Sequence, residues 1–384
     1  STASALDLAS TGTINLRGAG STLRTSGAGV TAAIVNGASV TGNLGNVATT
    51  GLGAQGALIT ASNAVDLTVG TVTTTGVGAR GIVVSSGGTS VLNATSVTTA
   101  AADAVVVGSI GNSSTTVGTV AIAGDNTRGV AVANGTSTGT GTTLVSATSG
   151  MGAVAASSTG TLSATGANSR VVDLNAGGNL TGSFNNVTAS GTGTSAIVAR
   201  SGGTQALTIA GTVAHSGTAA GLAAVDAQSG GALTVTNNGT VSTTGAAING
   251  INARSTAGTV TVAGTGTVTT SGAGATGVFA TTGTTGNAVA VTQGAVRTTG
   301  AGSTGVLALG TGATSVTLAL GSTTGAGARV IDATGGTVAV TTTGPITASG
   351  AANGTVREAI FANANTGAAV INTGTVTATS PGVR

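Results

Sequence analysis

The feature that most constrains the fold is a short unit that recurs along nearly the whole chain. In the copy at 70–84, Gly-Thr-Val opens the unit, a threonine run leads to Gly76, and an apolar run restarts at Ile82. Related text recurs at 240–253, 267–280 and 295–309. Counted at the glycine after each Thr/Ser run, successive units lie about 25 residues apart. This period predicts a solenoid, in which each unit buries its apolar side against its neighbours.

Within each unit, apolar residues alternate with small polar ones, as Leu233 does with Val235 and Val260 with Val262. Alternation with a period of two indicates a β-strand, and Val and Thr suit a pleated sheet. Helices are disfavoured because glycine, at 69 of 384 residues, interrupts nearly every window. We therefore predict an all-β fold, a parallel β-helix with about 25 residues and three short strands per coil and roughly 15 coils.

The repeat runs through the whole chain and has one irregular step. The step from Gly150 to Gly166 is much shorter than the others, which indicates either a truncated unit or a shift in the alignment. The continuity of the repeat predicts a single domain over 1–384. Because both ends lie within a unit, we interpret the chain as a fragment or a protomer of a longer array, whose open ends would stack end to end.

Composition limits which residues can build the core and which classes of partner are expected. Hydrophobic residues make up 40% of the chain and charged residues 5%, and with three Phe and no Trp or Tyr the interior has to be built from Val, Ala, Ile and Leu. All basic residues are arginine. The net charge is only +3 and the arginines form no cluster in the sequence, so no nucleic-acid partner is expected. No run approaches the ~18 apolar residues of a membrane span.

No cofactor is predicted. The absence of cysteine excludes disulfides and thiolate metal sites. The double glycines lack the repeated aspartates of calcium-binding β-rolls. The single histidine, His215, is expected at a surface turn and has no carboxylate near it in the sequence to orient it as a base.

Paired carboxylates are the remaining route to catalysis, because residues one coil apart become neighbours in a β-helix. Asp103 and Asp125 have such a spacing, as do Asp332 and Glu358. Polysaccharide-cleaving β-helices need a carboxylate pair or a carboxylate-bound cation. Arginines flank the second pair (Arg329 and Arg357), which favours a charge ladder between coils over a catalytic or cation site. We therefore predict that the protein is not an enzyme.

Two sets of side chains are candidates for ligand contact. Arginines that precede a restarting strand could contact anions or glycans, or could be solvated turn residues that discourage edge pairing; they are Arg80, Arg128, Arg170 and Arg329. Threonines that flank an inward valine would form outward ladders, as on ice-binding faces, or would simply be the polar residues of an exposed strand. These threonines are Thr71, Thr73, Thr234, Thr236, Thr259, Thr261, Thr267 and Thr269.

The residue pattern of the repeat resembles that of a known family. Asn-Asn-Gly-Thr-Val at 237–241 is followed by Thr-Thr-Gly and by Asn-Gly-Ile-Asn-Ala at 249–253, and a related Asn-Thr-Gly-Thr-Val stands at 372–376. This pattern resembles the passenger domains of Gram-negative autotransporters and related large bacterial surface adhesins. The resemblance implies a right-handed parallel β-helix exported to the cell surface. The chain departs from that family in having few charges, no aromatic-rich cap and no membrane barrel, so a translocator would be separate or removed.

These observations together predict a non-enzymatic extracellular protein, structural or adhesive, that forms a β-helical rod at or outside a bacterial cell surface. Its expected partners are other copies of itself, stacked end to end into a filament or side by side, and surface glycans or other cells. The first alternative is an ice- or glycan-binding module that uses the threonine ladders. The second is a polysaccharide-active β-helix enzyme.

Overall fold

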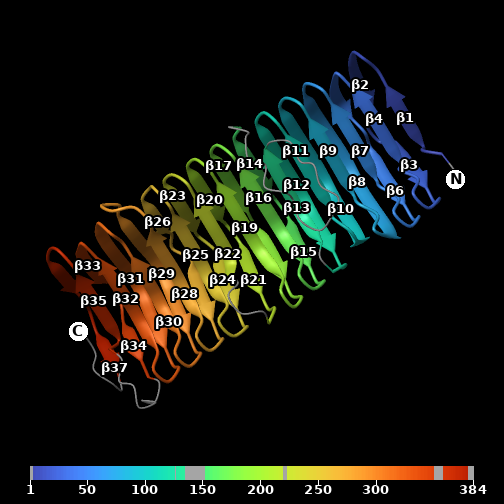
Figure 1. Cartoon of the computed structure of the whole chain (residues 1–384). Coiled ribbons are helices and arrows are strands. Elements are labelled where there is room, and N and C mark those ends of the chain that lie inside the picture. The colour runs from blue at the N-terminus through green and yellow to red at the C-terminus, as the bar shows by residue number, and fades with distance from the viewer. Residues whose placement is uncertain (1–2, 126, 135–151, 219–222, 350–357, 379–384) are drawn as a thin grey trace. The chain divides into compact units, whose positions relative to one another are not determined.

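The chain folds as a parallel β-solenoid of about 13 turns with about 25 residues per turn (Figure 1). The computed structural model describes residues 3–125, 127–134, 152–218, 223–349 and 358–378. All regular elements in these ranges are strands, and every strand pair is parallel, with hydrogen bonds running between successive turns. The predicted fold class and period are therefore confirmed.

The chain separates into two compact units, 1–194 and 195–384. Each unit has three faces, and the strands of one face stack on the equivalent strands of the next turn. The prediction that the whole chain acts as one domain stays a prediction.

Face A is the sheet that contains the first strand of each turn. In the first unit its strands are β1 (Leu6–Ala9), β4 (Ala33–Gly37), β7 (Ala57–Ala61), β9 (Ile82–Ser86), β11 (Val105–Ser109), β13 (Arg128–Asn134) and β16 (Arg170–Ala176). In the second unit they are β19 (Ser195–Ser201), β22 (Ala223–Ser229), β25 (Asn249–Ser255), β28 (Thr276–Thr282), β30 (Thr304–Leu309), β32 (Arg329–Gly335) and β35 (Ile360–Ala364).

Faces B and C follow in each turn. In the first unit, face B contains β2 (Thr13–Arg17), β5 (Ser39–Asn43), β14 (Val154–Ser158) and β17 (Leu180–Phe184), and face C contains β3 (Thr22–Thr25), β6 (Asn46–Thr49), β15 (Thr161–Ala164) and β18 (Asn186–Ala189). Long strands cover both faces at β8 (Val65–Val77), β10 (Ser90–Ala101) and β12 (Ser113–Ile122).

The second unit repeats this arrangement. Its face B contains β20 (Gln205–Ile209), β23 (Leu233–Asn237), β26 (Val260–Ala263), β33 (Thr337–Thr342) and β36 (Ala369–Asn372). Its face C contains β21 (Thr212–His215), β24 (Thr240–Thr243), β27 (Thr267–Thr270), β34 (Ile346–Ala348) and β37 (Val376–Ala378). The strands β29 (Val289–Thr298) and β31 (Ala313–Thr323) cover both faces.

The turns number about 13, not the roughly 15 predicted, and one of the units counted in excess falls between β13 and β16. Arg128 of β13 pairs in register with Arg170 of β16, so the chain between them completes a single turn. Gly166 accordingly stacks on Gly124 of the turn before. The anchor placed at Gly150 lies outside the described residues.

The interior is built from stacked small apolar side chains, as composition predicts. On face C of the second unit, Val213, Val241, Val268 and Val296 form one buried column in register. Burial of such columns is the main favourable contribution to the stability of a solenoid, which has no larger core to draw on. Of the three phenylalanines, only Phe184 is buried in this interior.

The corner after face C is built from two glycines with different roles. A Cβ on the first, as at Gly272, would lie 1.9 Å from the carbonyl oxygen of Gly245 on the preceding turn, so a side chain cannot fit. The second, as at Gly274, has a φ of +68° and open space around it. Asn168 and Ala247 stand in this second position with φ of 52° and 53°. The text Gly-x-Gly therefore encodes a close approach followed by a left-handed residue.

Hydroxyl side chains that point inward hold the corners. Before the corner after face C, Thr74 donates to the carbonyl oxygen of Ala79 at 2.7 Å, and Thr243 donates in the same way to Ile248 at 3.0 Å. At the corner after face A, the buried Ser109 donates to the carbonyl oxygen of Gly111 at 2.9 Å. These bonds satisfy backbone acceptors that the strand pairing leaves free.

Candidate ligand-binding face

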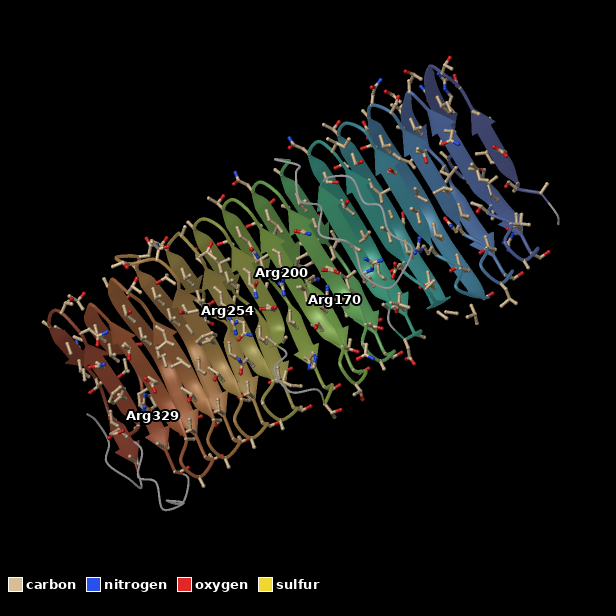
Figure 2. The ribbon with its side chains drawn as sticks, in the orientation of Figure 1. Arg170, Arg200, Arg254 and Arg329 are labelled. Atoms are coloured by element: carbon tan, nitrogen blue, oxygen red, sulfur yellow. The ribbon has the colours of Figure 1, made fainter. Side chains whose placement is uncertain are left out.

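Most of the charged side chains in the described residues gather on face A and on the corner that leads into it. The arginines there are Arg80, Arg128, Arg170, Arg200, Arg254 and Arg329, and the acids are Asp7, Asp103, Asp173, Asp226, Asp332 and Glu358. Figure 2 shows Arg200, Arg254 and Arg329 on the strands of this face in the second unit, and Arg170 on it in the first. Faces B and C carry mainly Thr, Ser and Ala on their outer surface.

In the first unit the charges form ion pairs between turns and within a strand. The carboxylate of Asp103 lies 2.5 Å from the guanidinium of Arg128 and 4.0 Å from that of Arg80. Arg170 pairs with Asp173 at 2.9 Å. Of the sequence-predicted arginines, Arg80, Arg128 and Arg170 therefore share one column at the start of face A, and the protein's own carboxylates engage them. Whether they also contact anions or glycans stays a prediction.

The predicted neighbourhood of Asp103 and Asp125 is wrong. The register of β11 and β13 places Asp103 beside Arg128, because the two turns are offset by 25 residues and not by the 22 that separate the two acids. Asp125 instead accepts a hydrogen bond from the backbone N–H of Ala167 at 2.7 Å, at the corner of the next turn.

The second carboxylate pair does come together, through an arginine. The guanidinium of Arg329 lies 2.6 Å from Asp332 and 3.0 Å from Glu358, and it also covers the ring of Phe361 at 4.5 Å. Asp332 stacks directly on Phe361, so the two acids do not face each other in register. Arg357, the other predicted flanking arginine, lies outside the described residues. Both carboxylates are thus bound to one cation, which is the geometry of a charge ladder.

The predicted ladder threonines all lie on the outer surface, with the intervening valines buried. They fall into short files on different faces. Thr240 and Thr267 stack on each other, but the next residue in that file is Ala295. The neighbouring file runs from Ser242 through Thr269 to Arg297. Thr234 and Thr261 stack on face B, where the file ends at Ala290, while Thr71 and Thr73 belong to the other unit.

His215 is buried, with 1% of its surface exposed, so its predicted position at a surface turn is wrong. It ends β21 and pairs in register with Thr243 in the buried corner column. Alternation along the strand explains this: Val213 points inward, and so does the residue two positions later.

The described residues contain no group of three or more His, Cys, Asp or Glu side chains that could hold a metal ion. A hollow of about 710 Å³ in the first unit is lined by residues such as Ala9, Asn36 and Ser62. Its size suits a small ligand, but its lining has no charged or aromatic side chain to orient one.

Sequence reasoning did not single out Arg200 and Arg254. Arg200 donates to Asp226 at 2.9 Å, and the guanidinium of Arg254 lies 5.0 Å from the ring centroid of Phe279. A signal was present, because Ala-Arg-Ser recurs at 199–201 and 253–255, at the end of equivalent strands. Alternation from the buried Ala199 and Ala253 places each arginine on the outer surface.

No protein-family model matches the chain, and neither a curated protein nor a solved structure is significantly similar to it. Among the described residues, no helix is long and apolar enough to span a bilayer.

Proposed function

We propose that this protein is a non-enzymatic extracellular component of a bacterial surface, structural or adhesive, of the kind that autotransporter passengers and large adhesins represent. The observation that supports this most is that the repeated side chains hold the turns of the solenoid together. Valines fill the interior, Thr and Ser close the corners, and the arginine–acid pairs join successive turns. A chain whose repeated residues stabilise the stacking of its turns is suited to act as a scaffold that presents its outer faces.

The arginine-bound carboxylates favour this proposal over a polysaccharide-active enzyme. A glycosidase needs one carboxylic acid and one carboxylate on either side of a sugar. Asp332 and Glu358 instead both bind one cation, Arg329, so the two carboxylates flank a guanidinium and not a sugar. The interrupted threonine files likewise favour a scaffold over an ice-binding surface, because Ala and Arg break the regular spacing of hydroxyls.

Self-association is part of the proposal. In the described residues β1 pairs with β4 along one edge only, and an unpaired strand edge is a template for another parallel strand. A second copy would continue the stack.

The experiment is to stain intact and permeabilised cells of the source bacterium with an antibody against 195–384. Staining of intact cells, together with retention of bacteria or surface polysaccharide on beads coated with the purified protein, is the expected result. Signal only after permeabilisation would refute the extracellular role. Analytical ultracentrifugation over a wide concentration range tests self-association, which a strictly monomeric protein would contradict.

A further inference from the structure

Two arginines occupy equivalent outer positions on face A of the second unit but meet different residues on the next turn. Arg200, Gln228 and Arg254 stack in one column, and Asp226, Asn252 and Phe279 stack in the column beside it. Arg200 reaches across to Asp226 on the following turn, and Arg254 reaches across to Phe279 in the same manner. The chain thus repeats one geometry with a phenyl ring in place of the carboxylate.

This replacement leaves the hydrogen-bonding capacity of Arg254 unused. A carboxylate accepts N–H bonds and neutralises the cation, whereas a ring attracts the flat face of the guanidinium and leaves its N–H edges open. Arg254 is exposed, and no carboxylate among the described residues forms an ion pair with it. A guanidinium held over a ring, with its Cζ 5.0 Å from the centroid, has lost part of its freedom before a ligand arrives, which favours bidentate binding of a planar oxyanion.

The surroundings of Arg254 indicate what carries that oxyanion. Gln228 and Thr281 stand on either side of it in the same column, at the spacing of about 4.8 Å between strands. They offer an amide and a hydroxyl, both half-buried at the surface. In the next column Phe279 stacks on Leu307, so an apolar strip runs beside the polar one. Sugars present hydroxyls beside C–H faces, so their hydroxyls can meet the polar column while their C–H faces meet the apolar strip.

We propose that the surface formed by Gln228, Arg254, Phe279, Thr281 and Leu307 binds a carboxylated polysaccharide, with a uronate carboxylate paired to Arg254. This inference rests on the proposed extracellular role, because such polymers are met outside the cell. The two proposals can fail independently. If the protein is stained on intact cells but does not bind the polymer, only the binding site is refuted. If the purified protein binds the polymer but is stained only in permeabilised cells, only the extracellular role is refuted.

The test is isothermal titration of the full chain with polygalacturonate oligosaccharides at low and high NaCl. Wild-type protein should bind, with affinity that falls as salt rises. Arg254→Gln should weaken binding by about tenfold or more, since a charge-assisted bidentate contact is lost. Arg297→Gln is the matched control, because it removes an exposed arginine from face C of the same unit, and it should change affinity by less than about twofold.

A second variant tests the geometry directly. Phe279→Asp supplies Arg254 with the partner that Asp226 gives Arg200, so binding should be lost while the melting temperature is kept. Should that variant fold poorly, Arg254→Gln still decides the matter, because it alters an exposed side chain. The proposal is overturned by unchanged binding of Arg254→Gln, by equal losses in Arg254→Gln and Arg297→Gln, or by equal affinity for neutral dextran, sulfated dextran or polyglutamate.

Discussion

At the scale of single residues, the corner glycines have two separable reasons to be glycine. Gly272 has no room for a side chain because the preceding turn lies against it, whereas Gly274 has room but a left-handed backbone. The two costs differ in kind, since the first is steric overlap with a neighbouring turn and the second is local backbone strain.

Gly272→Ala should therefore destabilise the second unit by about 3 kcal/mol, near the upper end of overpacking costs. Gly274→Ala, two residues away, should cost about 1 kcal/mol, the price of a left-handed alanine. Urea unfolding followed by circular dichroism measures both. Equal effects of the two substitutions would contradict the distinction.

Ala247 is the one described alanine in the left-handed region. Ala247→Gly should raise stability by about 0.5 to 1 kcal/mol, because it removes that strain. Ala246→Gly is the control, since its backbone is not left-handed and added freedom in the unfolded chain should lower stability by a similar amount. The same denaturant titration distinguishes the two signs.

At the scale of elements, β8 carries two adjacent threonines with opposite roles. Thr73 is half-exposed on the outer surface, whereas Thr74 is buried and bonded to the corner. Thr74→Val keeps the shape but leaves the carbonyl of Ala79 without its donor, which should cost about 1–2 kcal/mol. Thr73→Val should change stability by less than about 0.5 kcal/mol. Hydrogen exchange at 76–79 should rise only in the first variant.

Arg329 joins β32 to the residues that lead into β35. Arg329→Gln should destabilise this part of the fold by about 2 kcal/mol, because two mostly buried carboxylates lose their shared cation. Hydrogen exchange at 358–364 reports the change, and Arg297→Gln provides a comparison that should have little effect. Unaltered exchange in Arg329→Gln would show that the ladder does not hold these turns together.

At the scale of the whole molecule, a solenoid stabilises each turn through its neighbours only. Fragments 1–194 and 195–384 should therefore each fold alone, with circular dichroism typical of β-sheet and hydrogen exchange protected in the central strands. A fragment without protection would show that its turns depend on contacts beyond their neighbours.

The sequence by itself determined the parallel β-solenoid, its period, its valine interior and the lack of helix in the described chain. These follow from local patterns: alternation sets which side chains point inward, and glycine spacing sets where the chain turns. The same reasoning placed Arg80, Arg128 and Arg170 in one column correctly.

Only the tertiary structure decided which residues meet on adjacent turns. Hydrogen bonds between turns fix the register, and turns of unequal length stack equally well because extra residues leave the ladder at a corner. Allowing the step to vary in length therefore paired Asp103 with Asp125, 22 residues on, where the register places Arg128, and it counted one unit too many between β13 and β16. For the same reason the contact of Arg254 with Phe279, and with it the candidate site, could not be read from spacing alone.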